Sequence, residues 1–174
     1  ADPAALELLA GATDALAALS GAGYRLIVVT NQSGVARGLF ALGEARAMGA
    51  RLAALLRPAG VRLDGYYLCP HHPDGPVAAL GVRCECRKPA PGLLLRAARD
   101  LRIDLARSWT IGDMPSDVAA GAAAGTRTVL VDSGSLALAA GAPAGALLAR
   151  NIAHAAMLVL AADGHLCVSI AACD

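Results

Sequence analysis

Apolar runs rich in β-branched residues alternate along this chain with longer stretches in which apolar residues recur at helical spacing. Continuous apolar runs are typical of strands that are buried on both faces of a parallel sheet, and the helices between them form the crossovers. We therefore predict an α/β fold in which a Rossmann-like parallel sheet lies between two layers of helices. The predicted strands are residues 24–30, 61–68, 108–112 and 127–131, and the predicted helices are residues 4–22, 41–57, 91–101, 115–124 and 151–162.

The length of 174 residues favours a single domain over residues 1–174, because it is too short for two domains with full cores. The net charge of +1 gives no broad attraction to nucleic acid or acidic membranes, so neither is an expected partner. The most apolar stretches, 134–149 and 152–162, are interrupted by glycine, proline or polar residues, and no transmembrane helix is predicted. Residues 133–174 are the least interpretable part, a C-terminal helix and tail in which 166–170 could form an edge strand. We expect a monomer.

Three of the five cysteines lie within residues 69–90, a long segment rich in Pro, Gly, Cys and His that has no predicted strand or helix. A loop of this length in a compact domain needs a functional or metal-based reason to be ordered. Three thiolates and one imidazole suit a closed tetrahedral zinc site, which would stabilise the loop by about 10–16 kcal/mol. The predicted ligands of this structural zinc ion are Cys69, His71, Cys84 and Cys86.

Two alternatives to this ligand set stay open. His72 competes with His71, although the alternation Cys-x-His matches Cys-x-Cys and favours His71. The cysteines could also be free buried thiols beside a surface histidine. No secretion signal is recognised in these residues, and a cluster of reduced cysteines then predicts a cytoplasmic location.

Lys88 is the only lysine among the 15 basic residues of the chain. An Ala- and Arg-rich composition is typical of a genome that replaces lysine with arginine wherever either residue serves. Lysine carries a compact charge with three donors, whereas arginine carries a planar fork, so a retained lysine marks a site where arginine does not serve. Arg87 lies beside it, and a rigid pair of cations suits a phosphate. The alternative is chance survival of Lys88 at a surface position.

Polar residues follow the predicted strands, at the edge where open parallel sheets bind ligands. Asp113 follows one strand and Asp117 lies in the first turn of the next helix, where two carboxylates could bind Mg²⁺ or could simply cap the helix. Thr30 ends another strand, and the segment 30–34 offers hydroxyl, amide and backbone N–H donors to an anion. The alternative for this second segment is an ordinary loop.

In order along the chain, the segments VVTNQSG, CPHH with CECRKP, and TIGDMPSD resemble motifs of the haloacid dehalogenase superfamily of phosphatases. The resemblance covers residues 1–132 and is strongest to the branch whose members act on heptose bisphosphate, with the histidinol-phosphate branch as the alternative. The segment QSGVARG and the long spacer between Cys69 and Cys84 favour the heptose branch. The resemblance implies a three-layer fold without a large cap domain, a small sugar phosphate as substrate, and a place in lipopolysaccharide biosynthesis.

The resemblance also implies a mechanism in which an aspartate attacks phosphorus and water then cleaves the aspartyl-phosphate. Thr30 and Asn31 would contact the transferring phosphoryl group, and Lys88 would neutralise its charge. Asp113 would bind Mg²⁺, and Asp117 would support that site. The implied substrate-binding residues are Ser33, Arg37 and Arg87.

The motif Asp-x-Asp-Gly, which carries the nucleophile in this superfamily, does not occur in residues 1–174. The resemblance places its strand in the middle of the sheet, beside residues 24–30, and the loss of a central strand would expose two buried strand edges. We therefore expect a further segment before Ala1. The alternative is a non-catalytic remnant that binds phosphates or a protein partner.

Overall fold

The computed structural model describes residues 3–131 and 145–165. Its strands are β1 (Ile27–Asn31), β2 (Gly65–Cys69), β3 (Trp109–Gly112), β4 (Arg127–Val131) and β5 (Leu147–Ala149). Its α-helices are α1 (Ala12–Gly21), α2 (Ser33–Ala36), α3 (Leu42–Leu56), α4 (Gly92–Leu101), α5 (Pro115–Ala124) and α7 (Ile152–Ala162), and its 3-10 turns are η1 (Pro3–Ala5), η2 (Arg57–Ala59) and η3 (Leu105–Arg107).

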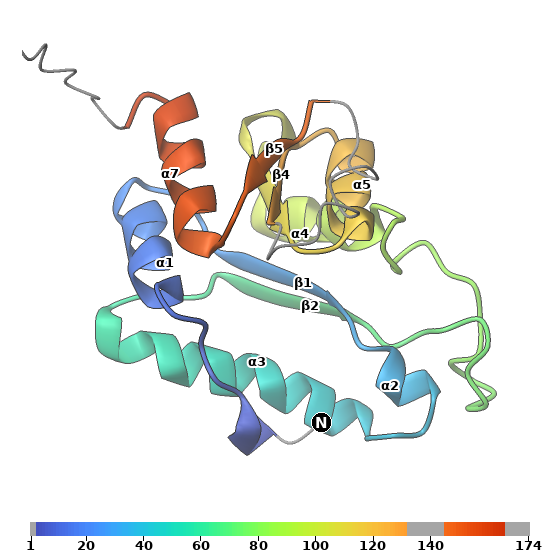
Figure 1. Ribbon diagram of the computed structural model, residues 1–174. Coiled ribbons are helices and arrows are strands. Elements are labelled where there is room, and N and C mark those ends of the chain that lie inside the picture. The colour runs from blue at the N-terminus through green and yellow to red at the C-terminus, as the bar shows by residue number, and fades with distance from the viewer. Residues whose placement is uncertain (1–2, 132–144, 166–174) are drawn as a thin grey trace, which may run out of the picture.

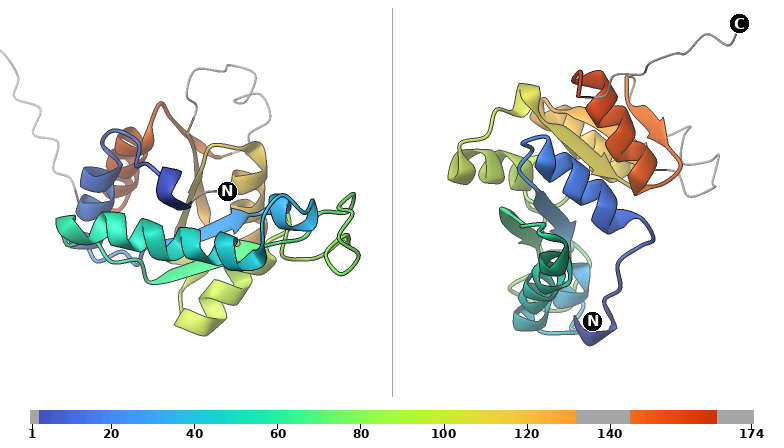
Figure 2. Two further views of the ribbon diagram at one scale, coloured as in Figure 1. Left: turned by 90° about the horizontal axis from the view of Figure 1, so that it is seen from below. Right: turned by 90° about the vertical axis from the view of Figure 1, so that its left-hand side faces the viewer.

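The strand pairs in the described residues are all parallel (Figure 1). β1 pairs with β2 so that Ile27 lies beside Gly65 and Asn31 lies beside Cys69. The other sheet has the order β3-β4-β5. Helices α3 and α4 contact β2, and helices α5 and α7 contact β4, which gives a layered α/β arrangement (Figures 1 and 2). The predicted parallel α/β fold is therefore confirmed.

A cleft of about 1410 Å³ lies between the two sheets. It is lined by residues 27–30 of β1 on one side and by residues 109–113 of β3 and its end on the other. Within the described part of the chain, β1 pairs only with β2, and β3 pairs only with β4. The two strands that border the cleft thus each have one edge without a strand partner among the described residues.

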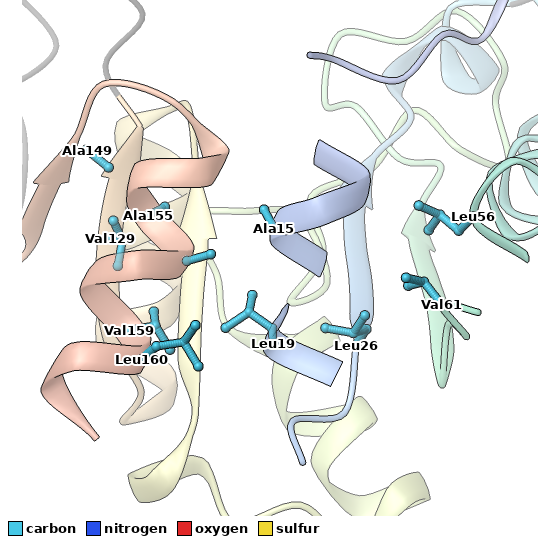
Figure 3. Close-up of a cluster of buried hydrophobic side chains, with 11 residues drawn as sticks. Ala15, Leu19, Leu26, Leu56, Val61, Val129, Ala149, Ala155, Val159 and Leu160 are labelled. Atoms are coloured by element: carbon cyan, nitrogen blue, oxygen red, sulfur yellow. The ribbon is translucent and has the colours of Figure 1, made fainter. Parts of the chain in front are cut away.

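The hydrophobic core joins the two sheets through helices α1 and α7 (Figure 3). Leu19 of α1 packs in one cluster with Val159 of α7, Val129 of β4 and Leu56 of α3. The buried residues of this cluster are leucine, valine and alanine. Because the chain has few aromatic residues, close packing of these aliphatic side chains fills the core. None of the described helices is long and apolar enough to cross a membrane.

The predicted helix over residues 4–22 is wrong in its first half. Only the short turn η1 and the helix α1 form there, and α1 begins at Ala12. Gly11 precedes it with φ of 75°, a left-handed conformation that breaks a helix running through residues 6–11. Leu9 is 78% exposed, so its helical spacing from the other leucines does not reflect a buried helix face.

Other boundaries also differ from the predictions. The strand predicted at residues 61–68 begins only at Gly65. Just before it, the Asp64 carboxylate accepts the Leu26 amide N–H at 2.9 Å, and the Asp64 N–H donates to the Leu26 carbonyl at 2.7 Å. The segment 30–34, for which an ordinary loop was the alternative, runs into the single turn of α2. Strand β5 was not predicted, and the suggested edge strand at residues 166–170 lies outside the described residues.

Candidate active site

Polar side chains gather where the parallel strands end. Thr30 and Asn31 are the last two residues of β1, and Asp113 directly follows β3. Thr30 and Asp113 line the cleft between the sheets together with Lys88 and Asp117. The carboxyl ends of the strands are where ligands bind in open parallel sheets. Four of the residues that the sequence singled out therefore share one cleft.

The Lys88 side chain is held at two points. Its Nζ lies 2.7 Å from Asp117 Oδ1 and donates to the backbone carbonyl of Val29 at 2.9 Å. Only 13% of the Lys88 side chain and 11% of the Asp117 side chain are exposed. A buried charge of this kind is stable only when it is paired, and removal of one partner typically costs about 3–5 kcal/mol. The ammonium group thus occupies a fixed position in the cleft.

The backbone at Lys88 is fixed as well, and Asn31 is the residue that fixes it. The Lys88 amide donates to Asn31 Oδ1 at 3.1 Å, and Asn31 Nδ2 donates to the Lys88 carbonyl at 3.2 Å. Both ends of the Asn31 amide are engaged in this way. The Asn31 side chain therefore ties the end of β1 to the segment that carries the lysine.

Asp117 caps a helix, which is one of the two alternatives from the sequence, and it also pairs with Lys88. Its Oδ2 accepts the backbone N–H of Met114 at 3.0 Å, which caps the start of α5, while its Oδ1 pairs with Lys88. A Cβ at Gly112 would lie 2.2 Å from the Asp117 Cβ, so glycine is required for this close approach. The cap and the ion pair use different oxygens of one carboxylate.

Asp113 and the end of β1 present groups that can still bind a ligand. The Asp113 side chain is exposed and makes no hydrogen bond or ion pair to another described residue. Thr30 Oγ1 accepts from Gln32 Nε2 at 3.1 Å, and Ser33 begins α2 next to it. Gln32 was not among the predicted site residues, and the only signal for it was its position in the loop after a buried strand.

The four predicted metal ligands come together, with one ligand atom from each within 4.8 Å of all the others. Cys86 Sγ is 3.1 Å from Cys69 Sγ and 3.3 Å from Cys84 Sγ, and His71 Nδ1 is 3.3 Å from Cys86 Sγ. His72 lies outside this cluster. The three cysteines are not joined in disulfides. Three sulfurs and one imidazole nitrogen in this arrangement fit a four-coordinate zinc ion.

The electrostatics of the thiols also favour a bound cation. Burial raises the pKa of the Cys69 thiol. Burial and the hydrogen bonds to Cys69 and Cys84 raise the pKa of Cys86. For Cys84, burial opposes ionisation, but hydrogen bonds from Cys86 and Cys69 outweigh it and lower the pKa. Once one thiol has ionised, its negative charge makes the other two thiols harder to deprotonate. A bound divalent cation would offset this repulsion between thiolates.

The two predicted substrate-binding arginines both contact the cysteine-containing segment. Arg87 Nη1 donates to the His71 carbonyl at 3.3 Å. Arg37 follows α2, and its Nη2 lies 3.2 Å from Nε2 of His72. Val77 N–H donates to the Ala36 carbonyl at 3.1 Å, which holds this part of the loop against α2.

Comparison with known proteins supplies the context for this geometry. A family model described as HAD-hydrolase-like matches residues 85–155. The D-glycero-β-D-manno-heptose-1,7-bisphosphate 7-phosphatase of Yersinia pestis is 46% identical over 129 residues, which are 74% of this chain and 69% of that protein. The enzyme of the same name from Escherichia coli K12 is 44% identical over 129 residues, 74% of this chain and 68% of that protein. This chain belongs to the heptose bisphosphate phosphatase family.

Solved structures of this family agree with the fold described above. A D,D-heptose 1,7-bisphosphate phosphatase from B. bronchiseptica, in complex with magnesium and phosphate, matches with a TM-score of 0.80 and 33% identity over 92% of this chain and 88% of that chain. The corresponding protein from Burkholderia thailandensis matches with a TM-score of 0.67 and 31% identity over 91% of this chain and 89% of that chain. Membership of the heptose bisphosphate phosphatase family places this chain among the phosphoric monoester hydrolases.

Proposed function

We propose that this chain forms the body of a Mg²⁺-dependent phosphatase that removes the 7-phosphate from D-glycero-D-manno-heptose 1,7-bisphosphate. The observation that carries the proposal is the buried Lys88–Asp117 pair beside the exposed Asp113, at the strand ends of a cleft. Phosphoryl transfer depends mainly on positioning and on neutralisation of charge, and this group of residues provides both. The names of the relatives support the substrate, and a place in lipopolysaccharide biosynthesis is part of the proposal.

The proposed roles follow from the contacts. Lys88 neutralises the transferring phosphoryl group from a position set by Asp117 and by the Val29 carbonyl. The Thr30 hydroxyl and the start of α2 at Ser33 offer hydrogen bonds to the same group. Asp113 supplies carboxylate oxygens, the ligands that Mg²⁺ prefers, and Asp117 supports that site through its contacts with Lys88 and Met114. Bound there, Mg²⁺ would offset the negative charge of the phosphate.

In this proposal the nucleophile comes from a further segment, and its position is supported by the strand edges beside the cleft that have no partner among the described residues. We propose an extended strand between β1 and β3, parallel to both, which carries an aspartate at its carboxyl end. The facing edges of β1 and β3 have no strand partner among the described residues. A strand in this position would end beside Thr30, Lys88 and Asp113. Residues 1–174 would then form one domain with that strand.

The cysteine-containing segment has a separate proposed role. Cys69, His71, Cys84 and Cys86 hold one structural Zn²⁺, and Arg87 and Lys88 directly follow the last of these ligands. The ion would therefore fix the loop from which the catalytic ammonium group extends. Thiolates that must stay reduced for this purpose suit a cytoplasmic protein.

Substrate competition tests the proposed function. With the strand supplied and Mg²⁺ present, heptose 1,7-bisphosphate should release phosphate faster than histidinol phosphate, and the product should retain its 1-phosphate by ³¹P NMR. Faster turnover of histidinol phosphate would support the sister branch. No turnover of either substrate would favour a phosphate-binding protein without activity.

A further inference from the structure

The Thr30 hydroxyl uses its oxygen as an acceptor and keeps its hydrogen available. Gln32 Nε2 donates to Thr30 Oγ1 at 3.1 Å. No acceptor in residues 3–131 and 145–165 takes the hydrogen of this hydroxyl. Thr30 lines the cleft together with Lys88 and Asp113. The hydroxyl hydrogen is therefore available at the place where phosphoryl transfer is proposed.

Gln32 is held beside Thr30 by its own backbone. β1 pairs with β2 as far as Asn31 and Cys69. One residue further, the Gln32 N–H donates to the Cys69 carbonyl at 2.8 Å, and the Gln32 carbonyl accepts the Val35 N–H at 3.1 Å. Thr30 and Gln32 are two residues apart at the end of an extended strand, so their side chains leave it on the same side. The Gln32 amide thus has a fixed approach to the Thr30 oxygen.

This contact determines which way the Thr30 hydroxyl points. A hydroxyl has one hydrogen and two lone pairs, whereas an amide nitrogen only donates. Because Gln32 Nε2 brings a hydrogen to one lone pair of Oγ1, the hydroxyl hydrogen must point away from the amide. The Lys88 ammonium has three hydrogens, and the Val29 carbonyl and Asp117 accept two of them. The cleft thus offers an anionic oxygen two donors, Thr30 Oγ1 and Lys88 Nζ.

We propose that Gln32 is a positioning residue for phosphoryl transfer, whose side-chain amide keeps the Thr30 hydroxyl oriented to donate to a phosphoryl oxygen. Gln32 is not among the residues that line the cleft, so it acts through Thr30 and not by contact with the substrate. A hydroxyl that donates to an anionic oxygen forms a bond about twice as strong as a neutral one. A hydroxyl that presents a lone pair would repel that oxygen. The reaction in this inference rests on the proposed function, and the orientation rests on the contact between Gln32 and Thr30.

Two variants of similar size at position 32 separate the direction of the hydrogen bond from its presence. Gln32→Glu supplies only acceptors, so the Thr30 hydroxyl would turn its hydrogen towards the new carboxylate and away from the cleft. Gln32→Met supplies no donor, so the hydroxyl stays free to donate to the phosphoryl group. In the catalytically complete protein with Mg²⁺, kcat/KM should fall by at least about 100-fold in Gln32→Glu and by less than about tenfold in Gln32→Met.

Variants of Thr30 show whether these losses pass through the hydroxyl. Gln32→Glu also adds a negative charge, which weakens phosphate binding by itself. Thr30→Val removes the hydroxyl, so in this background Gln32→Met should cause no further loss and Gln32→Glu only the loss due to its charge. Thr30→Ser keeps the hydroxyl, and both Gln32 variants should then show their full effects. Equal fold-losses in the wild-type and Thr30→Val backgrounds would overturn the inference.

Binding of inorganic phosphate to the Mg²⁺-loaded, catalytically complete protein provides a measurement without turnover. By calorimetry, affinity should fall in the order wild type, Gln32→Met, Gln32→Glu, and the difference between wild type and Gln32→Met should vanish in Thr30→Val. Urea unfolding checks the fold, and if Gln32→Glu is destabilised, the Gln32→Met comparison decides. Equal affinity in all variants, or no binding, would overturn the inference.

The outcomes separate this inference from the proposed function. If the order of phosphate affinities holds but no sugar phosphate is hydrolysed, the proposed function is wrong and the role of Gln32 in orienting Thr30 stands. If heptose 1,7-bisphosphate is hydrolysed and Gln32→Glu keeps the wild-type rate, the proposed function stands and the role of Gln32 is overturned.

Discussion

At the scale of single residues, Lys88 offers the sharpest prediction. Its Nζ lies 2.7 Å from Asp117 Oδ1 and 2.9 Å from the Val29 carbonyl, so two acceptors hold a compact ammonium group. Lys88→Arg keeps the charge but replaces that group with a longer planar fork. We expect phosphate release by the catalytically complete protein to fall by at least about 100-fold, the usual cost of losing a donor to the transition state.

The exposed ion pair of Arg96 and Asp100 provides the control for this exchange. Its two charged atoms lie 3.6 Å apart, and the Arg96 side chain is 66% exposed. Arg96→Lys should therefore leave turnover within about twofold of wild type, as exposed pairs contribute little. If Lys88→Arg also retained the wild-type rate, the proposed role of the ammonium group would be wrong.

Composition and local motifs were enough to select single residues but not their partners. A lone lysine among 15 basic residues singled out Lys88, and a strand-end motif singled out Asp117. Their contact could not be predicted, because 28 intervening residues, including all of α4 and β3, decide whether the two side chains meet. The partner of Asn31 could not be predicted either. The resemblance implied contact with the phosphoryl group, whereas in the structure its side chain forms hydrogen bonds to the Lys88 backbone.

At the scale of elements, the cysteine-containing segment should depend on its metal. Cys84→Ser removes one of three thiolates from a cluster whose ligand atoms lie within 4.8 Å of one another. Elemental analysis should show close to one zinc per wild-type chain and much less in this variant. Proteolysis should then cut within residues 69–90, and turnover should fall because Lys88 follows the last ligand.

Cys167→Ser is the matched control for this variant, because it removes a cysteine far from the cluster in sequence. Zinc content and resistance to proteolysis should stay at their wild-type values. Unchanged zinc in Cys84→Ser would remove Cys84 from the ligand set.

Asp163, which follows α7, joins the C-terminal end of this helix to the first residues of β3 and β4. Its carboxylate accepts from Arg127 Nη2 at 2.9 Å and from Trp109 Nε1 at 3.1 Å, and the Tyr24 hydroxyl also donates to it. The hydrogen bonds from Arg127 lower the pKa of Asp163 to about 2, despite its burial, and burial and the Asp163 carboxylate raise the pKa of Tyr24 to about 12. Asp163→Asn should lower the free energy of unfolding by about 2 kcal/mol near neutral pH.

The pH dependence of this loss has a defined sign. Because the folded-state pKa is below the unfolded value of about 3.9, the stabilisation is complete above pH 4 and disappears as the pH falls towards 2. Urea unfolding of wild type and Asp163→Asn should therefore converge over that range. Asp14→Asn, which removes an exposed carboxylate from α1, should shift stability by less than about 0.5 kcal/mol. A constant difference from pH 7 to pH 2 would contradict the assigned role of Asp163.

Elements with strong periodic patterns were predicted more accurately than elements defined by tertiary contacts. The strand YRLIVVT and the helix after Pro91 both lie close to their predicted positions. Strand β5 has only three residues, in an Ala- and Leu-rich stretch, and it is a strand because it pairs with β4. The start of α1 was misplaced because the left-handed Gly11 outweighs the spacing of the leucines before it.

At the scale of the whole molecule, the central feature is the cleft between two sheets that helices α1 and α7 hold together. The sequence predicted that one strand is missing between residues 24–30 and its neighbour, from the resemblance of its motifs. Pairing between strands is non-local, so only the structure could show that β1 and β3 flank a space of about 1410 Å³ whose lining includes Lys88.

Strand complementation tests the account most directly. The chain should be assayed alone, and after fusion to an N-terminal apolar strand that ends in Asp-x-Asp-Gly, with heptose 1,7-bisphosphate and Mg²⁺. We predict phosphate release by the fusion, no release by the chain alone, and none when the first aspartate of the added motif is changed to asparagine. Release by the chain alone at the rate of the fusion, or a folded fusion without activity, would contradict the claim that the cleft receives the nucleophile.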